Sequence, residues 1–269
     1  MKAEDLKLVV QEKYGAIAKQ SLLLNQSSCC GTSGCCGDLD IKMIGDEYQN
    51  IDGHHKEADL GLGCGIPTQY AGIKPGDSVL DLGSGAGNDC FVARAIVGDT
   101  GKVTGLDFTE SMVSRAIDNN KKLGFTNVEF VQGDIEEMPF PKESFDVIVS
   151  NCVLNLVPDK NLAFAQMMRV LKPGGHFCVS DVVIKGNLPD KLQKDAEMYA
   201  GCVAGAIEIE EYLGIIAKNG FADTTVHKQK AISIPEDLLA NYLTPEEIAR
   251  FQNRENGIFS ITVSGYKQS

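Results

Sequence analysis

The feature that most constrains the fold is an alternation of strand-like and helix-like segments that begins near residue 76. Short apolar runs predict strands at 79–82, 103–106, 128–131, 145–150 and 176–183, and the stretches at about 88–97, 110–122 and 159–171 predict helices. This order is typical of βαβ units, which form a parallel sheet with right-handed crossovers. We therefore expect an α/β fold with a doubly wound, mostly parallel sheet.

The rest of the chain divides around this core. A helix is expected over 3–24, followed by a segment over 25–70 that is rich in Gly, Ser, Asn and Cys and has no sustained period. Further expectations are a cap at Thr109 or Ser111, a turn at 172–175, a helix over 208–219, a strand over 224–229, a helical stretch over 235–256 and a last strand over 258–266. We predict three parts: 1–70 with the Cys-rich segment, 71–185 as the cofactor-binding domain, and 186–269 as an α+β extension.

The charge excludes two classes of partner. Asp plus Glu outnumber Lys plus Arg by 37 to 25, which gives a net charge of −12. Nucleic acids and anionic membrane surfaces attract basic proteins, so neither is expected as a partner. The N-terminus has no apolar signal region, and no apolar run is long enough to span a membrane. A cytoplasmic location is expected, where the nine Cys stay reduced and form no disulfide framework.

A glycine loop follows the first strand of the core, in Val79-Leu-Asp-Leu-Gly-Ser-Gly-Ala-Gly87. Its G-x-G-x-G spacing differs from the dinucleotide fingerprint, and Asp81 before it would repel a pyrophosphate but hold an ammonium group. Asp107 ends the next strand, where it can accept both ribose hydroxyls, and Asp134 follows the third strand, where it can accept from an adenine amino group. An adenosyl group joined to an amino acid fits these positions, and that ligand is S-adenosylmethionine.

The predicted cofactor-binding residues come from the glycine loop and from the ends of the strands. They are Asp81, Gly83, Ser84, Gly85, Gly87, Asn88, Asp107, Phe108, Met112, Asp134, Ile135, Glu136 and Asn151.

The cysteines separate into classes when they are placed on this topology. Cys64, Cys152 and Cys202 fall near the carboxyl edge of the sheet, where ligands bind in open α/β folds. Three thiolates form a soft site, and soft ligands select soft acceptors. Cys90 and Cys178 are expected to be buried apolar residues. The remaining four, in a Gly/Ser-rich cluster, are candidates for redox exchange or accessory binding: Cys29, Cys30, Cys35 and Cys36.

Residues 76–183 resemble class I S-adenosylmethionine-dependent methyltransferases, which implies a seven-stranded sheet whose last strand is antiparallel. Four motifs narrow the resemblance to arsenite methyltransferases over about 45–225. They are Leu60-Gly-Leu-Gly-Cys-Gly-Ile-Pro67, the glycine loop, Ser150-Asn-Cys-Val-Leu-Asn-Leu156 and Cys202-Val-Ala-Gly-Ala206. One departure from the family pattern is Ile66, where Asn is expected.

The resemblance implies that Cys64, Cys152 and Cys202 bind trivalent arsenic, supplied as arsenite or a thiol conjugate, and that the product is a methylated arsenical. It also implies that paired cysteines form a disulfide when they return arsenic to trivalency, and we choose Cys64 and one of the N-terminal cysteines for that pair. A thiol reductant of thioredoxin or glutathione type would reset the enzyme. A monomer is compatible with the sequence. Two alternatives stay open: a methyltransferase for a small organic acceptor such as a quinone or sterol, and a protein that sequesters arsenic or zinc without catalysis.

Overall fold

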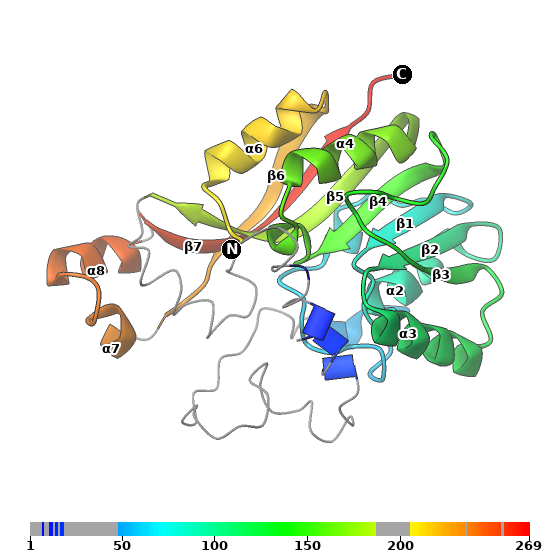
Figure 1. Cartoon of the computed structure of the whole chain (residues 1–269), viewed down its shortest axis with the longest axis horizontal. Helices are drawn as coiled ribbons and strands as arrows, with labels where there is room; N and C mark the ends of the chain where they lie inside the picture. Colours follow the sequence, from blue (N-terminus) through cyan, green and yellow to red (C-terminus); the bar gives the residue numbers. More distant parts are fainter. Residues whose placement is uncertain are drawn as a thin grey trace.

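One seven-stranded sheet organises the chain, in the order β3-β2-β1-β4-β5-β7-β6 (Figure 1). Strands β1 to β5 pair in parallel, and β7 is antiparallel to both β5 and β6. The strands are β1 (Ser78–Leu82), β2 (Lys102–Asp107), β3 (Val128–Gln132), β4 (Phe145–Asn151), β5 (Leu171–Lys185), β6 (Ala222–Ala231) and β7 (Gly257–Tyr266). The prediction of a mostly parallel sheet with an antiparallel last strand is confirmed.

Helices cover both faces of the sheet (Figure 1). The α-helices are α2 (Asn88–Val97), α3 (Glu110–Leu123), α4 (Lys160–Val170), α6 (Ile209–Lys218), α7 (Glu236–Leu239) and α8 (Pro245–Gln252). The short 3-10 helices are η1 (Tyr48–Asn50), η2 (Pro67–Gln69) and η3 (Leu154–Leu156). Helices α2 and α3 lie on one face, α4 and α6 on the other, and α7 and α8 at the end of the molecule beyond β7 (Figure 1).

This computed structural model describes residues 7, 11–12, 14–15, 17–18, 48–186, 205–234, 236–253 and 256–269. The described residues between 7 and 18 are helical, as the pattern over 3–24 predicts. Several predictions lie outside the described residues: those for the segment 25–47 and for Cys29, Cys30, Cys35, Cys36 and Cys202. The division of the chain into three parts stays a prediction. Within the described ranges, no helix has the length and apolar character needed to cross a membrane.

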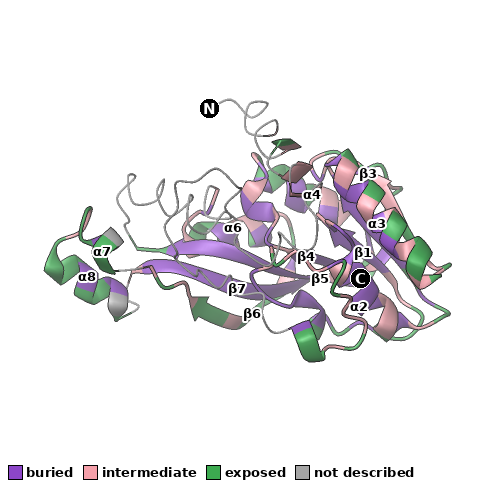
Figure 2. Cartoon of the chain, turned by 90° about the horizontal axis from the view of Figure 1, so that it is seen from below, coloured by how far each residue is buried: buried purple, intermediate pink, exposed green. Residues whose placement is uncertain are grey.

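The core shows why the strands form where the apolar runs predict them. Successive strand residues point to opposite faces, so a sheet covered on both sides needs continuous apolar runs. In β4, Val147 and Val149 pack in the cluster that contains α2, whereas Ile148 packs in the cluster that contains α4 and α6. Cys178 of β5 is fully buried in the cluster that contains α2. In Figure 2 the strands β5 and β7 are buried along most of their length, whereas the edge strand β6 is mostly exposed.

Three local predictions are wrong in detail. The residues of the turn expected at 172–175 lie inside β5. The pairing of β5 with β4 shifts register after Phe145, and Gly174 has φ +75°. A bulge therefore stands where a turn is expected. The helical stretch at 235–256 is interrupted after Leu239, because Thr244 starts α8 with a capping box. Thr109 is the N-cap of α3, but its side chain makes no capping bond.

We expect Phe164→Ala to test the packing between α4, α6 and the sheet. Phe164 is fully buried, and its ring contacts those of Phe177 and Tyr212. Truncation of a buried phenylalanine lowers the free energy of unfolding by about 3–5 kcal/mol. The matched control, Leu162→Ala on the exposed side of the same helix, should change it by less than about 0.5 kcal/mol. Urea unfolding measures both, and equal losses would contradict this core assignment.

Candidate functional site

A cavity lies over the carboxyl ends of β1, β2 and β4, beside the point where the chain's strand order reverses. This is where open α/β sheets bind their ligands. All the predicted cofactor residues line it except Gly87 and Glu136. Tyr48 also lines it, as do residues that no sequence pattern indicated, among them Lys7, Tyr14 and Asp89. Whether the predicted residues bind a cofactor stays a prediction, but the fold brings them together.

The glycine loop between β1 and α2 forms one wall of the cavity. Gly83 has φ +68°, and a Cβ there would lie 2.3 Å from a methyl carbon of Val153, so no other residue fits. Gly85 has φ +52° and faces open space. Gly87 does not line the cavity; it packs against Phe91 and Phe130 at the N-cap of α2.

Two polar atoms of this loop lack a partner among the described residues, namely Ser84 Oγ and Asn88 Oδ1, and both are buried. Buried polar atoms are nearly always hydrogen-bonded. Both residues line the cavity, so a polar ligand there would supply the missing bonds. The site therefore fits a ligand with hydroxyl and amino groups, which are the groups that S-adenosylmethionine presents.

Asp107 ends β2 with its carboxylate fixed by two backbone bonds. Oδ1 accepts from the Thr109 N–H at 2.8 Å, and Oδ2 accepts from the Gly85 N–H at 2.9 Å. The side chain is almost fully buried, and burial raises its pKa although these bonds oppose the shift. The carboxylate is thus held in one orientation at the cavity wall, with lone pairs left for further donors.

Two more carboxyl groups are buried beneath the glycine loop. Asp81 accepts the thiol proton of Cys90 at 3.2 Å, and burial together with the nearby Asp89 raises its pKa well above the usual value. Burial also raises the pKa of Asp89, to about 6. Two buried carboxylates repel each other, and a cation bound in the cavity would relieve that repulsion. No sequence signal marked Asp89, because an acidic residue in the first turn of a helix is common.

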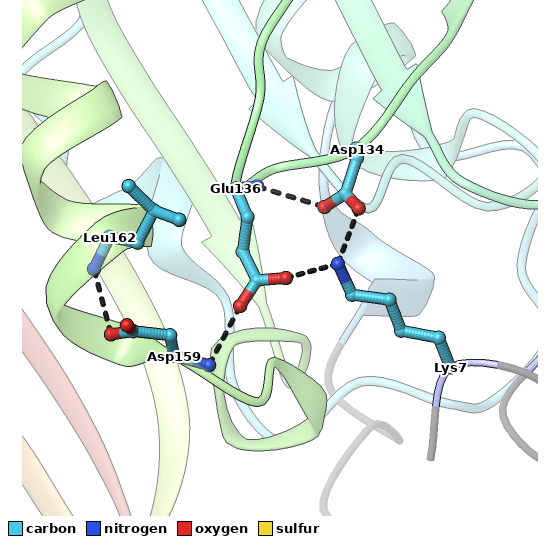
Figure 3. Close-up of polar contacts among 5 residues, drawn as sticks. All are labelled: Lys7, Asp134, Glu136, Asp159 and Leu162. Atoms are coloured by element: carbon cyan, nitrogen blue, oxygen red, sulfur yellow. Dashed lines mark hydrogen bonds and ion pairs between the residues drawn. The ribbon is translucent and has the colours of Figure 1, made fainter. Parts of the chain in front are cut away.

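Asp134 and Glu136 both point toward the ammonium group of Lys7 (Figure 3), and of the three only Lys7 and Asp134 line the cavity. Lys7 Nζ is 2.6 Å from Asp134 Oδ2 and also pairs with Glu136. The other Glu136 oxygen accepts from the Asp159 N–H at 2.7 Å, and Asp159 caps α4. Glu136 therefore fixes the N-terminus of α4 and does not line the cavity. An adenine amino group would share Asp134 with Lys7.

Cys64 and Cys152 come from distant segments and lie in one buried cluster, each 2% exposed. The Cys64 N–H donates to Asn151 Oδ1 at 3.0 Å, and the Cys64 carbonyl accepts from the Ser260 hydroxyl. The Cys152 N–H donates to the Ser180 carbonyl at 2.7 Å. Neither thiol forms a disulfide with another cysteine that the structure describes. Cys152 also lines the cavity, so this cluster adjoins the predicted cofactor site.

The backbone around these cysteines is tightly constrained. Cys152 has φ +61°, a conformation that costs energy for any residue with a Cβ and is often found at functional sites. A Cβ at Gly63 would lie 2.7 Å from Asn151 Nδ2, and one at Gly65 would lie 2.5 Å from Ser180 Oγ. The Cys64 segment can therefore approach β4 and β5 only because glycines flank it. Ala206, four residues after Cys202, packs in the same cluster.

The two remaining described cysteines are in the core, as predicted. Cys90 and Cys178 are fully buried, and burial raises the pKa of Cys178 to about 12. Both are therefore protonated thiols at neutral pH. Cys90 also has a polar role, since it donates to Asp81.

A buried polar group lies beneath the cysteines on the α4 and α6 face. Tyr212 donates to Asp181 Oδ2 at 3.0 Å, and the Lys160 ammonium donates to the Asn155 carbonyl at 3.3 Å. Asp181 is fully buried, and burial raises its pKa to about 6 despite the opposing charge of Lys160. No motif indicates this group, because its members are separated in the sequence by 21 or more residues, except Asn155 and Lys160.

Comparisons with known proteins agree with this geometry. A family profile described as a methyltransferase domain matches residues 73–235. The arsenite methyltransferase of Halobacterium salinarum is 40% identical over 81% of this chain and 58% of its own length. That of Aquipseudomonas alcaligenes is 34% identical over 94% of this chain and 71% of its own length. The crystal structure of an arsenic(III) S-adenosylmethionine methyltransferase from Chlamydomonas reinhardtii has a TM-score of 0.63 and 36% identity, covering 77% of this chain and 68% of that chain.

Another class of methyltransferase matches a shorter part of the chain. A ubiquinone/menaquinone biosynthesis C-methyltransferase from Vibrio campbellii is 44% identical over 131 residues, which are 48% of this chain and 50% of the relative. The chain spans 58% to 71% of the two curated arsenite methyltransferases given above. The longer matches are therefore those to arsenite methyltransferases.

We predict that Asp181→Asn flattens the pH dependence of stability. The folded state favours the neutral carboxyl, so it binds more protons than the unfolded chain between pH 3.8 and about 6. The contribution of the Asp181 carboxyl group to the free energy of unfolding is therefore present at low pH and lost as the pH rises through about 6. Urea unfolding from pH 4.5 to 7.5 should show the wild-type advantage over the variant shrinking as pH rises. The prediction is contradicted if the difference in the free energy of unfolding between wild type and Asp181→Asn stays constant with pH. It is also contradicted if the exposed control Asp118→Asn shows the same pH dependence.

Proposed function

This chain belongs to the arsenite methyltransferase family, and from that premise we propose that it transfers a methyl group from S-adenosylmethionine to trivalent arsenic bound by Cys64, Cys152 and Cys202. The observation that carries the proposal is the burial of Cys64 and Cys152 in one cluster beside the cavity that Cys152 also lines. Fold similarity alone would not select this acceptor, because one fold serves many substrates. The pair of buried cysteines beside the cavity, one of which lines it, supports a thiophilic acceptor.

The cavity residues fit the cofactor in their proposed roles. Asp107 would accept from the ribose hydroxyls and Asp134 from the adenine amino group. Asp81 would hold the ammonium group, whose charge offsets the buried carboxyls Asp81 and Asp89. Gly83 and Gly85 leave the loop free of side chains so that its backbone can approach the ligand. When bound, S-adenosylmethionine supplies an electrophilic methyl group on a positively charged sulfur.

The cysteines would bind and orient the metalloid. Trivalent arsenic is soft, and thiolates are the protein ligands that suit it. The reaction needs no general base, because the acceptor is a lone pair that carries no proton. The main contribution of the chain is alignment, which can lower a barrier by several kcal/mol, on the order of 7–11 in well-oriented systems. A backbone as constrained as that of Cys152 and Gly65 suits that task.

The redox half of the cycle follows from the family. Methylation raises arsenic formally to the pentavalent state, and two thiols can return it to trivalency by forming a disulfide. We assign Cys64 to that pair, with one of Cys29, Cys30, Cys35 and Cys36 as its partner, and a reductant of thioredoxin or glutathione type to reset it. The partner cysteine, the reductant, a monomeric state and a cytoplasmic location stay predictions from the sequence.

The proposal predicts that the single variants Cys64→Ser, Cys152→Ser and Cys202→Ser each lose arsenic methylation. A hydroxyl is a hard, neutral ligand that replaces a thiolate poorly, so activity should fall at least about 100-fold. Reduced protein is incubated with arsenite, S-adenosylmethionine and a thiol, and methylated arsenicals are separated and counted by arsenic-specific mass spectrometry. Cys178→Ala, which removes a buried thiol outside the cavity, should keep most activity.

Two outcomes would replace this function. If the wild type methylates a quinone and Cys152→Ser does not impair it, the acceptor is a small organic molecule. If the wild type binds arsenite but transfers no methyl group at any pH or reductant concentration, the protein sequesters the metalloid.

Asp107→Asn should weaken cofactor binding. The substitution replaces one carboxylate oxygen by an amide nitrogen, which donates and cannot accept. That nitrogen would face either the Gly85 N–H or the ribose hydroxyls, so one of these donors loses its acceptor. We expect the KM for S-adenosylmethionine to rise about tenfold or more, the usual size for a bond to a charged group. Methylation at saturating arsenite measures it, with Asp118→Asn as the exposed control. An unchanged KM would remove Asp107 from the cofactor site.

A further inference from the structure

Three polar side chains, two of them buried and one half-buried, connect the predicted cofactor cavity to the Cys64 segment. Tyr48 from η1 donates its hydroxyl to Asp89 Oδ1 at 2.5 Å, and Asn151 at the end of β4 donates to Asp89 Oδ2 at 3.0 Å. Asn151 Nδ2 also lies 2.9 Å from the Tyr48 hydroxyl. All three line the cavity. Each comes from a different element, so the group holds three parts of the fold together.

The same side chains hold the backbone on both sides of the Cys64 peptide. Asn151 Oδ1 accepts from the Cys64 N–H at 3.0 Å. The Gly65 carbonyl accepts from Asn151 Nδ2 at 2.9 Å and lies 3.2 Å from the Tyr48 hydroxyl. Asn151 directly precedes Cys152, whose φ of +61° makes its position sensitive to its neighbours. One amide therefore sets the spacing between two of the proposed arsenic ligands.

The orientation of that amide depends on Asp89. An asparagine side chain has a donor end and an acceptor end, and only one orientation presents Oδ1 to the Cys64 N–H. A carboxylate accepts and cannot donate, so Asp89 and the Gly65 carbonyl both attract the Nδ2 end and leave Oδ1 facing Cys64. Without this carboxylate, the Gly65 carbonyl alone would hold Nδ2, and the reversed amide, which places a donor against the Cys64 N–H, would become easier to populate.

We propose that Asp89 and Tyr48 are positioning residues that fix Cys64 relative to Cys152 by orienting the amide of Asn151. Neither residue needs to touch the arsenic. The part of the inference that concerns arsenic rests on the proposed function, whereas the position of Cys64 does not. Because the three side chains also line the cavity, the metalloid ligands and the cofactor site share one buried polar support.

The test measures how accessible Cys64 is in the reduced full-length protein without arsenic. Wild type, Tyr48→Phe and Asp89→Asn are alkylated with iodoacetamide, and mass spectrometry follows each cysteine-containing peptide over time. We expect Cys64 to react at least about tenfold faster in both variants, since each loses a bond to a charged or buried group. The matched control is Tyr70→Phe, whose ring is exposed and stacked on His227. It should leave the Cys64 rate unchanged.

Cys178 reports in the same samples whether a variant has simply unfolded, because it is fully buried, packs in the cluster that contains α2 and takes no part in this hydrogen-bonded group. The readout is the Cys64 rate divided by the Cys178 rate. A ratio that stays at the wild-type value in Tyr48→Phe overturns the proposal. A ratio that rises in Asp89→Asn alone also overturns it, because loss of a negative charge favours the Cys64 thiolate without any movement.

Arsenic methylation provides the second readout. Both variants should raise the KM for arsenite about tenfold while the KM for S-adenosylmethionine changes less, and equal changes would contradict a role at Cys64. If the wild type makes no methylated arsenic, the proposed function fails and the alkylation ratio still decides the positioning role. If the wild type is active and the ratio is unchanged, the function stands and the positioning role fails.

Discussion

Three carboxyl groups are buried at one edge of the sheet, and none of the ion pairs within the described residues involves them: Asp81, Asp89 and Asp107. Burial raises the pKa of each, and the pKa of Asp81 is raised further by the other two charges. Such a group destabilises the fold unless a cation or many donors compensate. The chain supplies a thiol, a phenol, an amide and backbone N–H groups as donors. The positive charge is left to the ligand, so the most costly part of the structure is also the part that fits a cationic cofactor.

The same edge carries the strain that brings the cysteines together. Cys152 adopts a left-handed backbone, and Gly63 and Gly65 lie where a side chain would overlap Asn151 and Ser180. Strain of this kind persists only where surrounding contacts enforce it. Here those contacts are the end of β4, the Ser180 carbonyl of β5 and Ser260 of β7. The antiparallel strand that closes the sheet therefore also holds the Cys64 segment, which links the fold of the C-terminal part to the site.

The sequence predicted what local pattern encodes. Apolar runs and turn residues gave the strands and helices of the core, and the position of acidic residues after strands placed Asp107 and Asp134 at the cavity. What it missed depends on contacts between distant residues. Tyr48 and Asp89 are 41 residues apart, and Lys7 and Asp134 are 127 apart, with no period that relates them. Glycine and proline are common in turns and in bulges alike, so the residues around Gly174 predict a turn where the structure has a bulge. The capping box at Thr244 is a local signal that divides the charged helical pattern in two.

The surroundings of Cys64 and Cys152 bear on which acceptor the site can hold. Their cluster is apolar, with Ile184, Leu239 and Phe251 among its members, and Asp89 lies on the other side of Asn151. Three thiolates around a trivalent metalloid form a neutral complex, whereas three thiolates around a divalent metal keep a net charge of −1. A neutral complex can be buried among apolar side chains without an ion to balance it. The charge balance of the pocket thus favours trivalent arsenic over zinc, independently of the softness of sulfur.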